Sequence, residues 1–178
     1  RNCLTALSND EAMLTQIFQY RFGEGAGLNG HTLGNLFITA LADITGSFEE
    51  AVAESGRVLA VQGRVLPSTL HDVKLVADKT INENQSEIRV TGESNIPTIE
   101  GRIKRVWLEP DNPLAYPPAV QAILSAELII VGPGSLFTSI LPNLLVPDLA
   151  EAVKASRGTK FYICNVATQT GETDGFTT

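Results

Sequence analysis

The stretch from residue 127 to residue 165 constrains the fold of this 178-residue chain more than any other. An aliphatic run ending at Val131 predicts a buried strand, and the turn Gly-Pro-Gly-Ser follows at once at residues 132–135. Apolar spacing over about 136–156 predicts a helix or a broken helix, and a second apolar run at 160–165 predicts another strand. Such a unit crosses over right-handedly and pairs its strands in parallel. Both strands should therefore end at the same edge of one sheet.

The remainder of the chain predicts helices and a separate antiparallel element. Residues 2–20, 31–41 and 48–60 carry apolar side chains at helical spacing. From 61 to 108 the pattern changes to alternating β-branched runs separated by polar turns, which predict a small antiparallel element with one wet face. We therefore predict one α/β domain over residues 1–178.

Composition and charge exclude several classes of function. The chain has 13 Lys and Arg against 20 Asp and Glu, a net charge of -7, and a basic cluster only at residues 102–105. Nucleic acid and anionic membranes are therefore not expected partners. No apolar stretch reaches the roughly 20 residues of a spanning helix. Cys3 and Cys164 lack metal-ligand spacing, which favours a reducing, cytoplasmic compartment without structural zinc. Because the chain lacks an initiator Met and stops in a loop-like segment, we expect a fragment of a longer protein.

The turn at residues 132–135 is the first candidate ligand site, because ligands of open α/β sheets bind beyond the carboxyl ends of the strands. A glycine allows close approach of the backbone, amides point outward at a helix N-terminus, and two hydroxyls add donors. These features predict an anion site formed by Gly132, Gly134, Ser135 and Thr138. The alternative is an ordinary corner with Ser135 as N-cap, and no named nucleotide fingerprint is matched.

The loop at residues 165–174 is the second candidate, because it follows the second strand, which we expect to be buried, and because its TQTGETD stretch at 168–174 contains only polar residues and glycine. Glu172 and Asp174 could hold a ribose hydroxyl, bind a divalent metal such as Mg²⁺, or act as a base, and their spacing does not choose. Asp174 is the metal candidate. The alternative is a solvated turn that caps a helix. The predicted ligand-binding residues of this loop are Asn165, Thr168, Gln169, Gly171, Glu172 and Thr173.

A third candidate lies at the start of the helix predicted from residue 31. Gly30, His31 and Asn35 could line a ligand cleft, with His31 as a phosphate donor or an acid or base. The alternative for His31 is a helix cap. The catalytic candidates of the chain are therefore His31, Glu172 and Asp174, and no residue pattern establishes a catalytic cycle.

Five blocks of this sequence, in collinear order, resemble one known family. They are GHTLGNL at 30–36, GRVLPST at 63–69, KRVWLEP at 104–110, GPGSLFTSILPNLLVP at 132–147 and CNVATQTGETDGF at 164–176. Together they closely resemble the gluconeogenesis factors of the YvcK type, which share a superfamily with the 2-phospho-L-lactate transferases (CofD). Thr170 departs from the pattern, since many relatives have Pro there, and the loop is expected to be less rigid.

The resemblance implies a Rossmann-like, three-layer α/β domain with a mostly parallel sheet and a small antiparallel insertion. It also implies a nucleotide diphosphate ligand. In the transferase branch that ligand is a lactyl-diphosphoguanosine, whose phospholactate passes to a deazaflavin. In the YvcK branch it is a UDP-sugar such as UDP-N-acetylglucosamine, a signal that links carbon supply to cell-wall synthesis and cell shape. The β-rich middle and the block GRVLP look like the YvcK branch.

We therefore expect a cytoplasmic regulatory protein that binds a nucleotide sugar and requires no cofactor. The resemblance implies enzymes of cell-wall precursor synthesis as partners. The sequence leaves open whether the protein forms a homo-oligomer. A transferase that acts on a nucleotide diphosphate donor with Mg²⁺ is the alternative, and a generic NAD-binding domain is a third. The Gly-rich loop with which family members open would precede this chain. Because the resemblance implies that this loop reads the nucleobase in part, the present sequence does not determine base specificity.

Overall fold

The computed structural model of the chain describes residues 2–8, 11–23, 27–81 and 86–177. The chain divides into two compact units, Arg1–Pro67 and Ser68–Thr178. Each unit has its own set of internal contacts and is described by itself. The prediction of one domain over residues 1–178 concerns the association of these units and stays a prediction.

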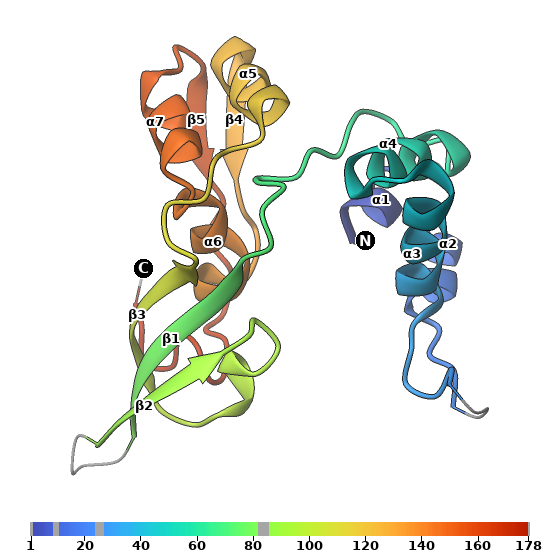
Figure 1. The fold of residues 1–178 in the computed structure, drawn as a ribbon. Helices are drawn as coiled ribbons and strands as arrows, with labels where there is room; N and C mark the ends of the chain where they lie inside the picture. The colour runs from blue at the N-terminus through green and yellow to red at the C-terminus, as the bar shows by residue number, and fades with distance from the viewer. Residues whose placement is uncertain (1, 9–10, 24–26, 82–85, 178) are drawn as a thin grey trace. The chain divides into compact units, whose positions relative to one another are not determined.

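The first unit is helical (Figure 1). Its helices are α1 (Asn2–Ala6), α2 (Glu11–Gln19), α3 (Leu33–Thr45) and α4 (Phe48–Val58). The side chain of Thr32 accepts a hydrogen bond from the Asn35 amide at 3.3 Å, and Ser47 does the same for the Glu50 amide at 3.0 Å. These residues satisfy amides that a helix start leaves without an intrahelical partner, which is why α3 and α4 begin where they do.

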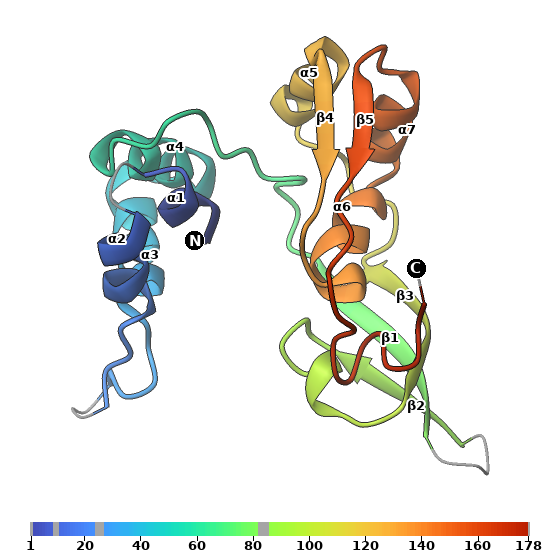
Figure 2. The same cartoon turned by 180° about the vertical axis from the view of Figure 1, so that it is seen from behind.

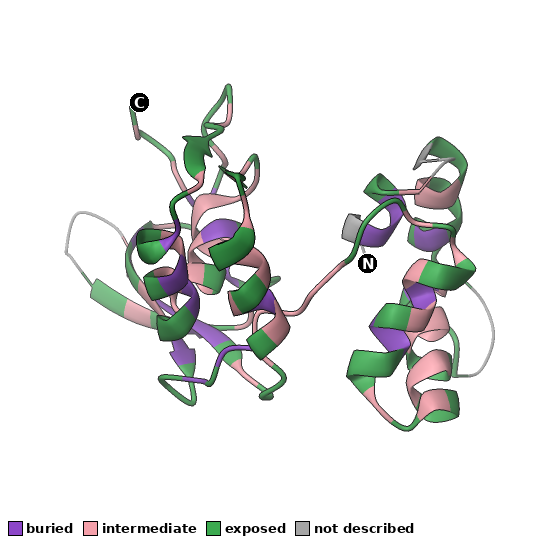
Figure 3. Ribbon diagram, turned by 90° about the horizontal axis from the view of Figure 1, so that it is seen from above, coloured by how far each residue is buried: buried purple, intermediate pink, exposed green. Residues whose placement is uncertain are grey.

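Buried residues form only short bands along the helices of the first unit (Figure 3). Phe18 of α2 is buried, and the centre of its ring lies 5.4 Å from the centre of the Phe37 ring in α3. Ala51 and Val52 are buried in α4, whereas Phe48 of the same helix stays 57% exposed. Burial in this unit therefore follows narrow helical stripes.

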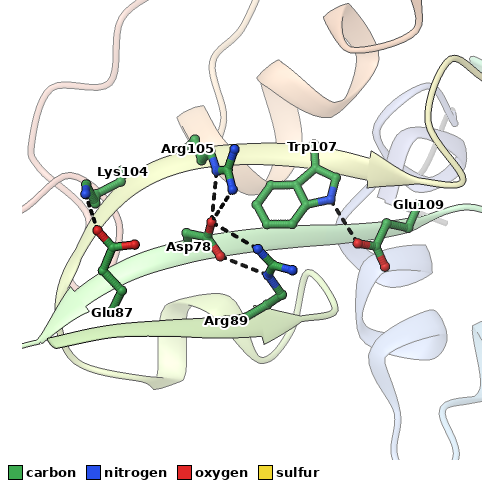
Figure 4. Close-up of polar contacts among 7 residues, drawn as sticks. All are labelled: Asp78, Glu87, Arg89, Lys104, Arg105, Trp107 and Glu109. Atoms are coloured by element: carbon green, nitrogen blue, oxygen red, sulfur yellow. Dashed lines mark hydrogen bonds and ion pairs between the residues drawn. The ribbon is translucent and has the colours of Figure 1, made fainter.

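The second unit contains the predicted antiparallel element, formed by β1 (Lys74–Ile81), β2 (Ser86–Thr91) and β3 (Arg102–Glu109). The strand order is β2-β1-β3, and both pairings are antiparallel. A bulge shifts the register of the β1–β3 pair between Asp78 and Lys79. The one wet face that the sequence predicts carries polar side chains from all three strands (Figure 4).

Asp78 is the centre of this face. It is only 7% exposed, and it accepts hydrogen bonds from Arg89 Nε at 3.0 Å and Arg105 Nε at 2.8 Å. Both guanidinium groups lie over the ring of Trp107, at 4.7 Å and 4.8 Å from its centre. The hydrogen bonds from Arg89, and then those from Arg105, lower the pKa of Asp78 below its ordinary value of 3.8. The folded protein therefore stabilises the carboxylate form of Asp78 relative to the unfolded chain.

Asp78→Asn should reduce stability at neutral pH, and the difference from the wild type should narrow under acid. Because the folded pKa of Asp78 lies below the unfolded one, its contribution is present above pH 3.8 and is lost as the pH falls through the folded value. Urea unfolding followed by Trp107 fluorescence from pH 2 to pH 7 measures this. Asp72→Asn, at an exposed position before β1, is the control. A constant difference down to about pH 2 would contradict the prediction, because ordinary carboxyl pKa values lie near 4.

The predicted strand, helix and strand are also present. β4 (Leu128–Val131) pairs in parallel with β5 (Thr159–Tyr162). The connection is a broken helix, made of a π-helix (Leu136–Ile140), α6 (Leu141–Leu144) and α7 (Pro147–Ala155). α5 (Pro117–Ser125) packs against α7, and the two cover one face of the β4–β5 sheet (Figures 1 and 2). The α/β class is therefore confirmed, with a parallel sheet beside an antiparallel one.

The prediction that both of these strands are buried was wrong for the described residues. Leu128 is 50% exposed and Ile130 is 54% exposed, and Phe161 of β5 is 57% exposed. The reason is geometric. Helices of the second unit cover one face of this sheet, and Figure 2 shows β4 and β5 from the opposite face with no helix of that unit in front.

Within the described ranges, no single helix has the length and apolar character needed to cross a membrane. The helical segments Leu136–Leu144 and Pro147–Ala155 meet the length and composition criteria only as a pair, and that pair is bent by 79°.

Candidate functional site

The Gly-Pro-Gly-Ser turn and the polar loop lie side by side beyond the carboxyl ends of β4 and β5. Asn165 Oδ1 accepts a hydrogen bond from the Gly134 amide at 3.2 Å, and its Nδ2 donates to the Gly134 carbonyl at 2.9 Å. Gln169 Nε2 donates to Ser135 Oγ at 2.9 Å. Side chains of the second loop therefore hold the first one through both its backbone and its serine.

Glu172 connects the two loops a third time. Its side chain is only 4% exposed; Oε2 accepts from the Phe137 amide at 3.2 Å, and Oε1 accepts from Thr138 Oγ1 at 2.8 Å. A carboxylate of the chain itself thus lies at the start of the π-helix, where we expected the anionic group of a ligand. A ligand phosphate at those same donors would meet this carboxylate. The role of Thr138 in ligand binding stays a prediction.

The polar loop is also ordered internally. Thr173 Oγ1 accepts from the Gln169 amide at 2.8 Å, and Asp174 Oδ2 accepts from the Gly171 amide at 2.6 Å. Asp174 is exposed, whereas Glu172 is buried. The two acids that the sequence could not tell apart therefore have different surroundings: Glu172 faces the protein, and Asp174 faces solvent.

Two glycines of the loops are required by close backbone contacts. Gly132 has φ of +90°, and a Cβ there would lie 2.5 Å from the Ile163 carbonyl oxygen. Gly171 has φ of +79°, and its Cβ would lie 2.1 Å from the Pro97 carbonyl oxygen. Other residues rarely adopt this conformation, and a side chain would strike fixed backbone in either case. Gly171 brings the polar loop against the 3₁₀ helix Ile96–Thr98.

Lys79 supports the loop from β1, and sequence reasoning missed it. Its side chain is fully buried, and Nζ donates to the Ile96 carbonyl at 2.9 Å, to the Gly171 carbonyl at 2.8 Å and to the Ile99 carbonyl. Burial lowers the pKa of Lys79, and the charges of Glu172 and Asp174 oppose that shift. Period-2 alternation would have found it, since it places Lys79 on the same face of β1 as the buried Leu75 and Ala77.

A pocket of about 480 Å³ opens beside these loops. That volume falls within the range of known small-molecule sites. Phe176 also packs edge-on against Phe137, with ring centres 5.9 Å apart. The pocket therefore combines aromatic surface with polar loop atoms at the sheet edge where ligands of α/β proteins bind. Its lining comes from both loops and the end of β5: Gly134, Leu136, Tyr162, Cys164, Asn165, Val166, Ala167, Thr168, Gln169, Thr173, Phe176 and Thr177.

The third candidate set, Gly30, His31 and Asn35, lies in the first unit, at and just before the start of α3. Thr32, the residue after His31, is the N-cap of that helix. The contribution of these three residues to a ligand cleft stays a prediction.

The described residues do not fit a Mg²⁺ site made by protein side chains alone. They contain no group of three His, Cys, Asp or Glu side chains placed to hold a metal ion. Both Glu172 oxygens accept hydrogen bonds, and one Asp174 oxygen does so as well. Mg²⁺ sites commonly use one or two carboxylates together with ligand phosphates. The assignment of Asp174 as a metal ligand stays a prediction.

The parallel strand-helix-strand unit, with a pocket at its carboxyl edge, is the arrangement of a Rossmann-like α/β fold. The family model described as 2-phospho-L-lactate transferase CofD matches residues 1–178, so the chain belongs to that family. This match confirms the superfamily that the five sequence blocks indicate.

Relatives within this family carry the name gluconeogenesis factor. The one from Bacillus subtilis is 49% identical over 177 residues, which cover 99% of this chain and 54% of that protein. A relative from a Nostoc species is 53% identical over 177 residues, 99% of this chain and 38% of its own length. A crystal structure of a Bacillus halodurans protein superposes with a TM-score of 0.85 at 48% identity, covering 98% of this chain and 54% of that one. The chain spans about half the length of these relatives, or less.

Proposed function

We propose that the protein is a cytoplasmic regulatory factor that binds a nucleotide sugar, with UDP-N-acetylglucosamine as the expected ligand. The observation that carries this proposal is the pocket at the carboxyl ends of β4 and β5, lined by residues 164–169 and by the Gly134 turn. Tyr162 and Phe176 line the pocket with aromatic surface for a nucleobase, and the polar loop offers donors and acceptors for the sugar and diphosphate.

Binding without turnover is supported by the hydrogen-bonding state of the loops. A catalytic base needs a lone pair directed at the substrate. Glu172 is buried and each of its oxygens accepts a hydrogen bond from the protein, while the Asn165 and Gln169 amides join the two loops. Side chains held in this way suit a preformed recognition surface. In the cell, such a factor would report nucleotide-sugar supply to enzymes of cell-wall precursor synthesis, and so influence cell shape on gluconeogenic carbon sources.

Titration calorimetry of the full-length protein tests this proposal directly. We expect saturable binding of UDP-N-acetylglucosamine and weaker binding of a GDP-sugar. No cleavage product of the nucleotide sugar should be released over hours. Cys164 gives an independent local readout, because its thiol is exposed and lines the pocket. Its alkylation by iodoacetamide, followed by peptide mass spectrometry, should slow several-fold at saturating ligand. The proposal would be refuted if the protein binds no UDP-sugar and if saturating ligand leaves the rate of Cys164 alkylation unchanged.

A transferase of the CofD type is the second candidate, favoured by the family match over residues 1–178 and by the solvent-facing carboxylate of Asp174. The diagnostic result is release of a nucleoside monophosphate from a nucleotide diphosphate donor in the presence of Mg²⁺. Asp174→Asn should abolish that release without abolishing donor binding. Absence of release across a panel of acceptors would count against this candidate.

A further inference from the structure

Lys79 links the antiparallel sheet to the loop that lines the pocket. We propose that Lys79 is a positioning residue for ligand binding: its ammonium holds the polar loop in the conformation that forms the pocket wall. The inference rests on the proposed nucleotide-sugar site, and it adds a role for the antiparallel sheet as the support of that site.

The geometry of the ammonium group carries this inference. Lys79 Nζ donates to three carbonyl oxygens, of Ile96, Ile99 and Gly171, which matches its three N–H donors. Two of these carbonyls belong to the turn between β2 and β3, and the third, of Gly171, belongs to the polar loop, 92 residues after Lys79. One side chain therefore joins two segments that share no strand pairing.

The position of Gly171 determines the position of the groups that follow it. Glu172 is the next residue, and its carboxylate bonds the Phe137 amide and Thr138. Asp174 returns to the Gly171 amide, so both the amide and the carbonyl of Gly171 are held. Gln169, two residues before Gly171, bonds Ser135 and lines the pocket. Displacement of Gly171 would therefore move both the wall of the pocket and its link to the first loop.

A second contact from the antiparallel sheet reaches the same segment. The Arg102 guanidinium at the start of β3 lies 5.7 Å from the centre of the Phe176 ring, which lines the pocket. Figure 2 shows the segment after β5 running from the parallel sheet down to the antiparallel one. Lys79 is the buried contact of the two, and a lysine is almost never fully buried unless its charge is paired or solvated by protein dipoles. Such burial is costly, and nearby carbonyl dipoles offset that cost.

The test compares Lys79→Met with Lys104→Met in the full-length protein. Met keeps the unbranched shape but cannot donate to the three carbonyls, whereas Lys104 is an exposed lysine on the neighbouring strand, paired with Glu87. We expect Lys79→Met to weaken UDP-N-acetylglucosamine binding about tenfold, because buried acceptors lose their donor. Lys104→Met should leave the affinity unchanged.

Hydrogen exchange without ligand separates positioning from general destabilisation. In Lys79→Met, amides of residues 165–177 should exchange faster, while amides of β1 and β3 keep their protection. If protection at 165–177 is unchanged, the inference is overturned whatever the ligand is. Wild-type protein that fails to bind any nucleotide sugar would refute the proposed function, whereas equal affinity of wild type and Lys79→Met would refute the positioning role alone.

A second variant keeps the test open if Lys79→Met does not fold. Lys79→Gln is neutral but retains two amide donors, so it should hold part of the carbonyl cluster. Its affinity and its exchange at residues 165–177 should fall between those of the wild type and those expected for Lys79→Met. If the affinity and the exchange pattern equal those of the wild type, neither the third N–H donor nor the positive charge of Lys79 is needed to hold the loop. That result would overturn the inference that the ammonium group positions it.

Discussion

Replacing Gly171 with Ala is expected to abolish nucleotide-sugar binding and to lower the free energy of unfolding of the second unit by about 3 kcal/mol. A Cβ at this position would lie 2.1 Å from the Pro97 carbonyl oxygen, and φ of +79° is unfavourable for alanine. The loop cannot keep its place with this side chain, so its bonds to Lys79 and Asp174 must lengthen. Calorimetry and urea unfolding of the full-length protein, followed by Trp107 fluorescence, measure the two effects.

Gly175→Ala is the matched control for this prediction. Gly175 has φ of +76°, close to that of Gly171, but a Cβ there would meet no atom within 4 Å. The substitution should cost about 1 kcal/mol for backbone conformation alone. The difference between the two variants isolates the contact with Pro97. Equal losses of stability would show that this contact does not constrain the loop.

Replacing Glu172 with Ala is the second substitution with a large expected effect. The Phe137 amide and the Thr138 hydroxyl would both lose their acceptor, at a cost of about 2 kcal/mol. The two loops would also lose one of the links that join them. We expect a marked loss of UDP-N-acetylglucosamine affinity and faster hydrogen exchange at residues 165–177. Unchanged affinity would contradict the prediction.

The binding of inorganic phosphate and of UDP to Glu172→Ala distinguishes two possible roles of the Glu172 carboxylate. If the start of the π-helix is the anion site of the ligand, removal of the carboxylate should strengthen the binding of inorganic phosphate or UDP. If Glu172 is part of the pocket support, both affinities should fall, which is the outcome we expect. Glu151→Ala on α7 serves as control, because that carboxylate is 70% exposed and pairs only with Lys154 among the described residues. It should change neither affinity.

The strands and most helices could be predicted from the sequence because their signals are local. Alternation of β-branched residues marked β1, β2 and β3, and the apolar spacing over residues 48–60 marked α4. The aliphatic run before Gly132 and the run ending near Cys164 predicted a parallel pair with neighbouring carboxyl ends. That prediction placed the two candidate loops at one edge of the sheet. The predicted burial of β4 and β5 was wrong, because burial depends on which other elements cover the sheet.

The roles of the charged residues could not be predicted from spacing. Glu172 and Asp174 are two positions apart, yet one is 4% exposed and bonded to the π-helix and the other faces solvent. The partners of Lys79 could not be predicted, because they are backbone carbonyls, which have no signature in a sequence. Gly171 was assigned to ligand binding from its motif, and the close approach of Pro97 supplies a structural reason for the same residue.

The sequence by itself determined the family, the order of helices and strands, and the two loops at the end of the parallel strands. Those properties follow from local periodicity, turn chemistry and collinear motifs. Only the tertiary structure decided which polar groups bond one another and which line the pocket. The physical reason is that hydrogen bonds such as those from Lys79 to Gly171 and from Thr138 to Glu172 join residues 92 and 34 positions apart, and only the folded chain brings them within 3 Å.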